Sequence, residues 1–290
     1  MTAQRALAPA TSAWSYIEVL KPRETSLLTF IGLFAAVVAG KGHPPVTVLL
    51  LVFVTLLLGS AGVNGLTNYL DREVDARMSR TCGRSLPSGR IRPPEKALPL
   101  LIALVPIGFV MAWFLHPWAF AAGLAGTVAA LVFRKTGFTH LLGSVSGCAP
   151  VAVGWFAVDP AFSWAIVFLC ILIAVWIPLH VWSVMLAHRD DYLGAGVSIF
   201  PLTWRSVTAV RTLLMLSLVL YAASIALYLM GGFGLVYLVV ANVLGITMVV
   251  ATFRLSLAPT SHSAWLVYKL SAFPYLGLLF LFMGIDLWLR

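Results

Sequence analysis

The feature that most constrains this chain is a series of long, almost uncharged apolar runs. Hydrophobic residues make up 61% of the sequence, charged residues only 10%, and the mean hydropathy is +0.97. A run of roughly 20 apolar residues can cross a bilayer as a helix, and continuously apolar runs are not typical of a barrel. We therefore expect an all-α polytopic membrane protein with nine transmembrane helices. The candidate spans are residues 25–40, 46–66, 97–115, 118–134, 140–158, 162–186, 209–230, 233–253 and 265–288.

The sequence predicts one membrane domain behind a short leading segment. We expect residues 1–24 to form a cytoplasmic N-terminal segment and residues 25–290 to form a single transmembrane domain. The leading segment lacks an apolar core followed by a small-residue cleavage site, so we expect no cleaved signal peptide. Cys82, Cys148 and Cys170 form no Cys-x-x-Cys pair, which argues against a disulfide framework or a zinc site.

Basic residues predict the orientation, because cytoplasmic loops of membrane proteins are enriched in lysine and arginine. If the N-terminus is cytoplasmic, only Lys41 and Arg290 among the 19 basic residues fall outside. We therefore expect a protein of a bacterial-type inner membrane, with its N-terminus in the cytoplasm and its C-terminus outside. This asymmetry explains the net charge of +9 without a nucleic-acid partner. Most charge lies in two loops after the second and sixth runs, so we expect the chemistry at the cytoplasmic face.

The first charged loop, NYLDREVDARMSRTCGRSLPSGRIRP, begins at Asn68 and holds three carboxylates and six arginines. Asn68, Asp71 and Asp75 are three and four residues apart, so they share one face if the helix of the second run continues for two turns. Hard oxygen ligands of this kind suit Mg²⁺, which is typically held by one or two carboxylates while substrate phosphates complete its shell. The loop therefore predicts a metal site on one face of a helix.

Arginines follow these acids closely in the same loop. Their forked donors match the geometry of phosphate, so carboxylates, metal and arginines together predict a diphosphate site. The simpler alternative is an ordinary positive-inside loop with local ion pairs, such as Glu73 with Arg77. Under the diphosphate interpretation, the candidate substrate-binding residues of this loop are Asn68, Arg72, Arg80 and Arg84, with Arg77 and Arg90 nearby.

The second charged loop belongs to the segment WIPLHVWSVMLAHRDDYLGAGVSIFP, residues 176–201, and supplies Asp190 and Asp191. Adjacent residues on a helix point about 100° apart, so we expect one carboxylate to ligate and the other to hold a water or an arginine. His180 and Trp182 lie a few turns earlier, inside the bilayer, where ionisable groups are expensive and usually functional. The alternative for this segment is a helix end with a solvated charge pair.

These residues resemble the intramembrane prenyltransferases of the UbiA superfamily, which have nine helices and two aspartate-rich motifs at cytoplasmic helix ends. The segment TNYLDREVD (67–75) is similar to the first motif and keeps both aspartates, with Thr67 at the usual asparagine. The segment RTCGRSLPSGRI (80–91) is similar to the arginine-rich stretch that follows it, with Ser85 at a usual proline. The resemblance implies a UbiA-like bundle whose active site opens at the cytoplasmic face.

Within the superfamily, the chain most resembles the protohaem IX farnesyltransferases, which make haem O. The segment WIPLHVW (176–182) keeps two tryptophans, a proline and the histidine of one typical stretch. The segment DDYLGAGVSIFP (190–201) is similar to a second stretch and keeps its Asp-Asp-Tyr and Ala-Gly. The segment FRKTGFTHLLGSVSGCAPVAVGW (133–155) is similar to a third. The resemblance covers residues 65 to 205.

This resemblance implies transfer of a farnesyl group from farnesyl diphosphate to a vinyl group of haem B, with Mg²⁺ assisting departure of the diphosphate. It implies a haem A synthase and the assembly of a terminal oxidase as functional neighbours. The implied catalytic and metal-holding residues are Asp71, Asp75, Asp190 and Asp191. The implied substrate-binding residues beyond those of the first loop are Arg134, Lys135, His180, Trp182 and Tyr192.

Several alternatives remain open. His180 is a ligand of haem iron or a partner of a haem propionate under this interpretation, whereas a histidine hydrogen-bonded between helices is the structural alternative. A UbiA-type enzyme acting on a quinone precursor, a chlorin or a lipid alcohol is the alternative function. A transporter or channel would more often show internal repeats and charge at the midplane. A scaffold without catalysis would not need both acidic loops intact.

Overall fold

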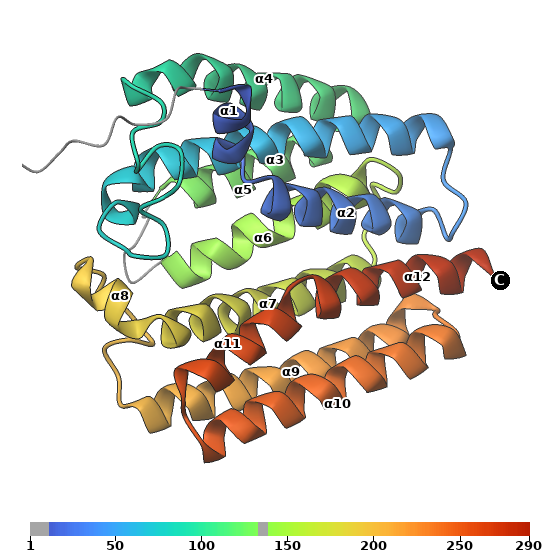
Figure 1. Ribbon diagram of the computed structural model, residues 1–290. Coiled ribbons are helices and arrows are strands. Elements are labelled where there is room, and N and C mark those ends of the chain that lie inside the picture. Colours follow the sequence, from blue (N-terminus) through green and yellow to red (C-terminus); the bar gives the residue numbers. More distant parts are fainter. Residues whose placement is uncertain (1–11, 133–138) are drawn as a thin grey trace, which may run out of the picture.

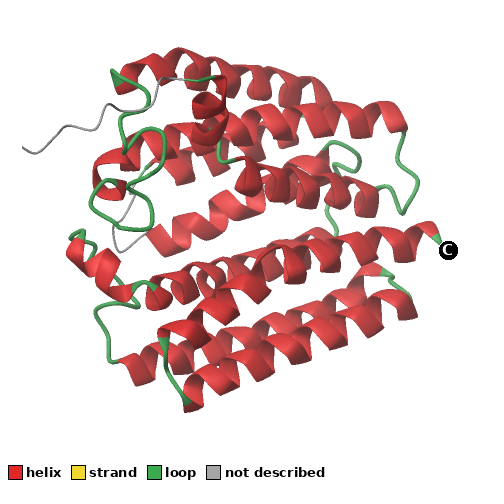
Figure 2. Ribbon diagram, viewed as in Figure 1, coloured by secondary structure: helices red, strands yellow, loops and turns green. Residues whose placement is uncertain are grey.

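The computed structural model describes residues 12–132 and 139–290, and in this part of the chain all regular structure is helical (Figures 1 and 2). The helices form a bundle, with two short helices and two long loops at one end. The elements are α1 (Ala13–Val19), α2 (Pro22–Ala39), α3 (Val46–Asp75), η1 (Pro94–Ala97), α4 (Leu98–Leu115), α5 (Pro117–Leu131), α6 (Thr139–Phe156), α7 (Trp164–Ala187), α8 (Arg189–Gly194), α9 (Ser206–Gly231), α10 (Leu235–Leu257), α11 (Ser261–Leu270), η2 (Ser271–Gly277) and α12 (Leu278–Trp288).

Each predicted apolar run coincides with a helical segment, and the last run comprises α11, η2 and α12 together. Within the described residues, seven segments are long and apolar enough to cross a membrane, whereas α5 is apolar but has only 15 residues. The helical, polytopic membrane architecture is confirmed, and the count of nine spans stays a prediction. The predicted leading segment, residues 1–24, contains α1 and also the first turn of α2.

Close helix packing holds the bundle together, because lipid tails are as apolar as the helices and give little hydrophobic drive for association. Small residues let backbones approach where α2 meets α6. A side chain added at Gly154 would place its Cβ 1.8 Å from the carbonyl oxygen of Gly32. The same logic applies to α3 and α4, where a Cβ at Gly108 would lie 2.8 Å from the Cα of Gly59. Glycine at these positions is therefore a packing requirement.

Prolines inside helices leave backbone carbonyls without a helical donor, and at one of them a neighbouring helix supplies the missing hydrogen bond. Pro178 lies inside α7 and has no N–H to donate to the carbonyl of Ala174. The hydroxyl of Ser144 on α6 donates to that carbonyl over 3.0 Å, so the polar group stays satisfied. Pro274 lies in η2, a π-helical break with a non-helical backbone at Ala272, which separates α11 from α12.

The two ends of the bundle differ in character. In Figure 1, α1, α8 and the loop that follows α3 gather at one end, and the C-terminus lies at the other. At the C-terminal end, Asp286 on α12 is buried, with 2% of its surface exposed. Its carboxylate accepts hydrogen bonds from the backbone N–H groups of Gly234 and Tyr237, the second over 3.1 Å. A carboxylate at a helix N-terminus is favourable, so Asp286 caps α10 from another helix.

Candidate active site

The first aspartate motif is carried by the end of α3. The helix continues nine residues past the predicted apolar run and ends at Asp75, which confirms the predicted two-turn extension. Asp71 and Asp75 therefore lie one turn apart. Asn68 is buried and its amide donates to the carbonyl of Val19 over 2.7 Å, so it ties α3 to α1. The substrate role predicted for Asn68 stays a prediction beside this structural contact.

Asp75 forms an ion pair with the loop that follows it. The guanidinium of Arg84 lies 3.1 Å from the Asp75 carboxylate, of which 10% is exposed. The hydroxyl of Thr81 donates to the backbone carbonyl of Asp75 over 2.8 Å. These contacts turn the loop back over the end of α3, so the predicted arginine and the predicted carboxylate lie side by side.

The second aspartate motif lies on α8 and docks against the first loop. Asp191 accepts hydrogen bonds from the backbone N–H groups of Ser79 over 2.7 Å and Arg80 over 3.2 Å, although Ser79 is 112 residues away in sequence. The Arg80 guanidinium donates to the Tyr192 hydroxyl over 3.1 Å and lies above that ring. We call Ser79, Arg80, Asp191 and Tyr192 the loop clasp. It connects the second motif to the loop that follows the first motif.

The electrostatics of the clasp follow from these contacts. Burial alone would raise the pKa of the Asp191 carboxyl, but the hydrogen bonds from the Ser79 and Arg80 amides and the charge of Arg80 outweigh it, so this pKa lies below its ordinary value. Burial lowers the pKa of neighbouring His188, the Arg80 charge lowers it further, and Asp191 opposes both. At neutral pH the clasp therefore joins an ionised carboxylate to a cationic arginine beside a neutral imidazole.

The remaining carboxylates of the two motifs are oxygen donors of the type that Mg²⁺ prefers. Asp190 is exposed at the end of the bundle and Asp71 is half-buried. Across residues 12–132 and 139–290, no three His, Cys, Asp or Glu residues gather into a ready-made metal cluster. Mg²⁺ commonly uses only one or two carboxylates and takes its other oxygens from phosphates and water, so this donor set suits it.

Three further cationic residues were predicted to bind substrate, and the structure describes one of them, Arg72. Arg72 lies over the Tyr69 ring at 4.3 Å and its guanidinium pairs with Glu73 at 3.2 Å, so it lies along the surface of α3. Arg134 is in the gap between the described ranges, and so is Lys135.

Sequence reasoning missed two charged residues, Glu18 and Lys21, that make contacts at this end. Glu18 on α1 accepts hydrogen bonds from the Ser85 hydroxyl and from the Arg90 guanidinium, the latter over 2.5 Å, and so anchors the first loop. Lys21 is the N-cap residue of α2, and its ammonium donates to the Thr67 hydroxyl over 3.2 Å. The sequence offered one signal for Lys21, which is a charged residue directly before a proline and lies outside the first charged loop.

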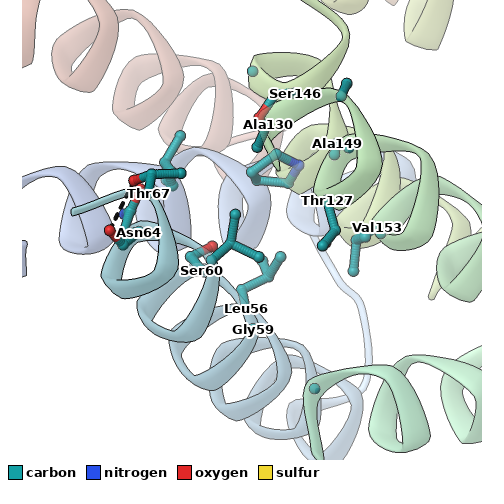
Figure 3. A pocket seen from close by; sticks show the side chains of 18 of the residues that line it. Leu56, Gly59, Ser60, Asn64, Thr67, Thr127, Ala130, Ser146, Ala149 and Val153 are labelled. Atoms are coloured by element: carbon teal, nitrogen blue, oxygen red, sulfur yellow. Dashed lines mark hydrogen bonds between the residues drawn. The ribbon is translucent and has the colours of Figure 1, made fainter. Parts of the chain in front are cut away.

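A cavity of about 370 Å³ lies between α2, α3, α4, α5, α6 and α7. Lys21, Asn64 and Thr67 belong to its polar lining with several serine and threonine side chains, and most of its wall is formed by glycine, alanine and other apolar side chains. Figure 3 shows Ser60, Asn64 and Thr67 on one side, with Thr127 and Ser146 across from them. The sequence did not reveal this cavity, because small residues on four separate helices create it only when those helices pack.

The predicted aromatic and imidazole residues lie on the neighbouring face of α7. His180 stacks between Trp176 and Tyr268, with ring centroids 4.8 and 4.6 Å away. Its Nδ1 lies 2.9 Å from the Ser271 hydroxyl. Trp182 packs edge-on against Phe200, with centroids 4.4 Å apart.

Comparison with known proteins gives this arrangement a family. The sequence profile of the UbiA prenyltransferase family matches residues 27–282. The chain belongs to the UbiA prenyltransferase family. Membership makes it a membrane-embedded prenyltransferase, as the resemblance predicted.

Curated relatives in this family match nearly the full length of the chain. The protoheme IX farnesyltransferase of Desulforudis audaxviator is 35% identical over 286 residues, covering 96% of this chain and 90% of that protein. The protoheme IX farnesyltransferase of Gloeobacter violaceus is 33% identical, covering 93% and 91%. The predicted resemblance to this branch of the UbiA family is therefore confirmed.

Solved structures show the same fold at low sequence identity. A structure from work on digeranylgeranylglyceryl phosphate synthase in membranes has a TM-score of 0.77 and 17% identity, covering 96% of this chain and 99% of that chain. A UbiA homologue from Archaeoglobus fulgidus bound to GPP and Mg²⁺ has a TM-score of 0.67 and 13% identity, covering 95% and 100%. These neighbours confirm the UbiA-like bundle.

Proposed function

We propose that this prenyltransferase transfers a farnesyl group from farnesyl diphosphate to a vinyl group of haem B and so makes haem O. The observation that carries the proposal is the loop clasp, which connects the second aspartate motif to the loop that follows the first. An apolar cavity enclosed by six helices supports it. The near full-length similarity to protoheme IX farnesyltransferases supports the choice of donor and acceptor.

The diphosphate is proposed to bind at the loops. Mg²⁺ held by Asp71, Asp75 and a carboxylate of α8 would neutralise the charge that develops on the leaving diphosphate. The guanidinium of Arg84 adjoins Asp75, and the Arg80 guanidinium belongs to the clasp. We propose that both donate to phosphate oxygens. Positioned charge of this kind is usually the largest contribution to such a reaction. Arg72, Arg134 and Lys135 are further proposed diphosphate contacts.

The farnesyl chain is proposed to lie in the cavity. Its apolar wall shields the allylic cation left by ionisation from water, which would otherwise trap it as an alcohol. The haem vinyl group attacks this cation. Water then adds to the resulting cation on the haem side and releases a proton, which leaves a neutral hydroxyl group. His180, Trp182 and Tyr192 are proposed to contact the substrates, with His180 at the haem iron or at a propionate.

The proposed orientation places the loops in the cytoplasm and the C-terminus outside, in a bacterial-type inner membrane. The single domain of residues 25–290 then presents its acidic loops to soluble farnesyl diphosphate and its bundle to a membrane-dissolved haem. A haem A synthase and terminal-oxidase assembly are proposed as the consumers of the product.

The deciding experiment is extraction of haem from cells with analysis by mass spectrometry. The chain is expressed in a bacterium without its own haem O synthase, beside the double variant Asp71→Ala, Asp75→Ala. We expect farnesylated haem with the wild type and unmodified haem B with the variant. Asp159→Ala is a matched control, because Asp159 lies in the loop between α6 and α7 at the opposite end of the bundle and should retain activity.

Unmodified haem B beside wild-type protein in the membrane would contradict the haem acceptor. Purified protein would then be supplied with labelled farnesyl and geranylgeranyl diphosphates and with quinone precursors. Prenylation of a quinone precursor, a chlorin or a lipid alcohol would establish the alternative UbiA-type function.

A further inference from the structure

The imidazole of His180 is held so that only its edges are available to a ligand. The Trp176 ring stacks on the imidazole with an interplanar angle of 14°. The Tyr268 ring also stacks on the imidazole, with an interplanar angle of 29°. A ring stacked against two aromatic neighbours contacts other groups in its own plane, through Nδ1 or Nε2. The state of each nitrogen therefore decides what His180 can bind.

Ser271 meets the Nδ1 edge because the last span is broken there. η2 begins at Ser271 and contains Pro274, so the backbone at this point departs from a regular helix. The Ser271 carbonyl accepts a hydrogen bond from the Trp176 indole over 2.5 Å. Its hydroxyl lies 2.9 Å from His180 Nδ1, and the residue is fully buried. One serine therefore holds both the histidine and a ring that stacks on it.

The number of protons on the Ser271 hydroxyl determines which group is the donor in its hydrogen bond with His180. The Ser271 hydroxyl oxygen also lies 2.9 Å from the backbone carbonyl of Tyr268. A carbonyl only accepts, and a hydroxyl has one proton to give. Both contacts are hydrogen bonds only if the serine proton goes to Tyr268 and Nδ1–H of His180 donates to the serine oxygen.

We propose that Ser271 is a positioning residue that keeps His180 in the Nδ1–H tautomer, so that the Nε2 lone pair ligates the iron of the haem acceptor. This inference rests on the proposed function and deepens it. An anionic propionate needs a donor, and Nε2 of this tautomer has no proton to donate, whereas a lone pair on imidazole suits iron. The hydrogen bonding of Nδ1 therefore favours the haem iron, and not a propionate, as the partner of His180.

The tautomer is tested directly by NMR of the full-length protein in lipid nanodiscs with ¹⁵N-labelled histidine. The resonances of His180 are assigned as those lost in His180→Ala. We expect a protonated Nδ1 and an unprotonated Nε2 in the wild type, and loss of this single pattern in Ser271→Ala. A protonated Nε2 in the wild type would overturn the proposal, whatever haem does.

The iron contact is tested by titrating purified protein with haem B and following the Soret band and the iron–imidazole resonance Raman signal. We expect Ser271→Ala to weaken haem binding about 10-fold or more, as loss of a group that orients a metal ligand commonly does. Ser271→Thr keeps the hydroxyl and should restore binding. Ser183→Ala is the matched control, because buried Ser183 makes a similar hydroxyl contact, to the His180 carbonyl over 2.8 Å, but does not contact the ring.

The outcomes separate the two proposals. Wild-type haem binding and iron–imidazole signal in Ser271→Ala would overturn this inference and leave the proposed function standing. A wild type that neither binds nor farnesylates haem B would overturn the proposed function and the iron contact together. If Ser271→Ala does not fold, Ser271→Thr and the wild-type NMR pattern still decide the tautomer.

Discussion

The two aspartate motifs of this enzyme are presented in different ways. Asp71 and Asp75 lie on consecutive turns of α3, a helix of 30 residues that is anchored in the bundle. Asp190 and Asp191 lie on α8, which has six residues and no buried side chain. The first motif is therefore placed by its own helix, whereas the second is placed by the loop clasp. Asp191 of the second motif therefore holds the other loop, and the comparison predicts that the first motif binds the metal.

The largest expected effect is on the motif carried by the long helix. Asp71→Asn removes a proposed metal-holding charge while keeping nearly the same shape, and we expect kcat to fall at least about 100-fold, the scale of losing one contact to developing charge. Steady-state farnesyl transfer measures it, with Asp159→Asn as the control. A drop of only a few-fold would show that the second motif carries most of the metal.

The next effect separates the two members of the second motif. Asp191→Ala removes both backbone hydrogen bonds of the clasp, so we expect the first loop to become sensitive to limited proteolysis and KM for the diphosphate to rise about tenfold. Asp190→Ala should lower kcat and leave the loop protected. Equal behaviour of the two variants would contradict the division of roles.

A smaller effect is expected from the ion pair beside the first motif. Arg84→Gln leaves the mostly buried Asp75 carboxylate without its counter-charge, so we expect the folded enzyme to lose thermal stability as well as diphosphate affinity. Arg77→Gln is the matched control, since Arg77 is exposed in the same loop. Equal loss of stability in both variants would show that general loop charge, and not the ion pair, is responsible.

The smallest effect is a pH dependence at the clasp. The pKa of His188 is lowered in the folded protein, so the folded state disfavours protonation of this ring. Its contribution to stability is complete above the ordinary value of about 6.5 and is lost as the pH falls through the lower folded pKa. His188→Gln should therefore flatten the decline in Tm between pH 7.5 and pH 5, as measured by thermal unfolding in detergent. A decline as steep as that of the wild type would contradict this.

Local sequence determined much of the fold. Length and continuity of the apolar runs place the helices, because backbone groups in lipid must be satisfied within the helix. The spacing of Asp71 and Asp75 likewise determines that they share a face once α3 continues. Motif resemblance gave the family, and the acidic loops were recognised from charge alone.

Tertiary structure decided what sequence spacing leaves open. The contact of Asp191 with Ser79, the anchoring of the first loop by Glu18 and the contact between Ser271 and His180 each join residues far apart in the chain. Side-chain type shows that these groups will seek partners, but only the packed helices determine which partner lies within hydrogen-bond distance. The cavity has the same origin, since its small residues create space only where several helices meet. Local periodicity therefore determined the helices of this protein, and the packing between them determined its site.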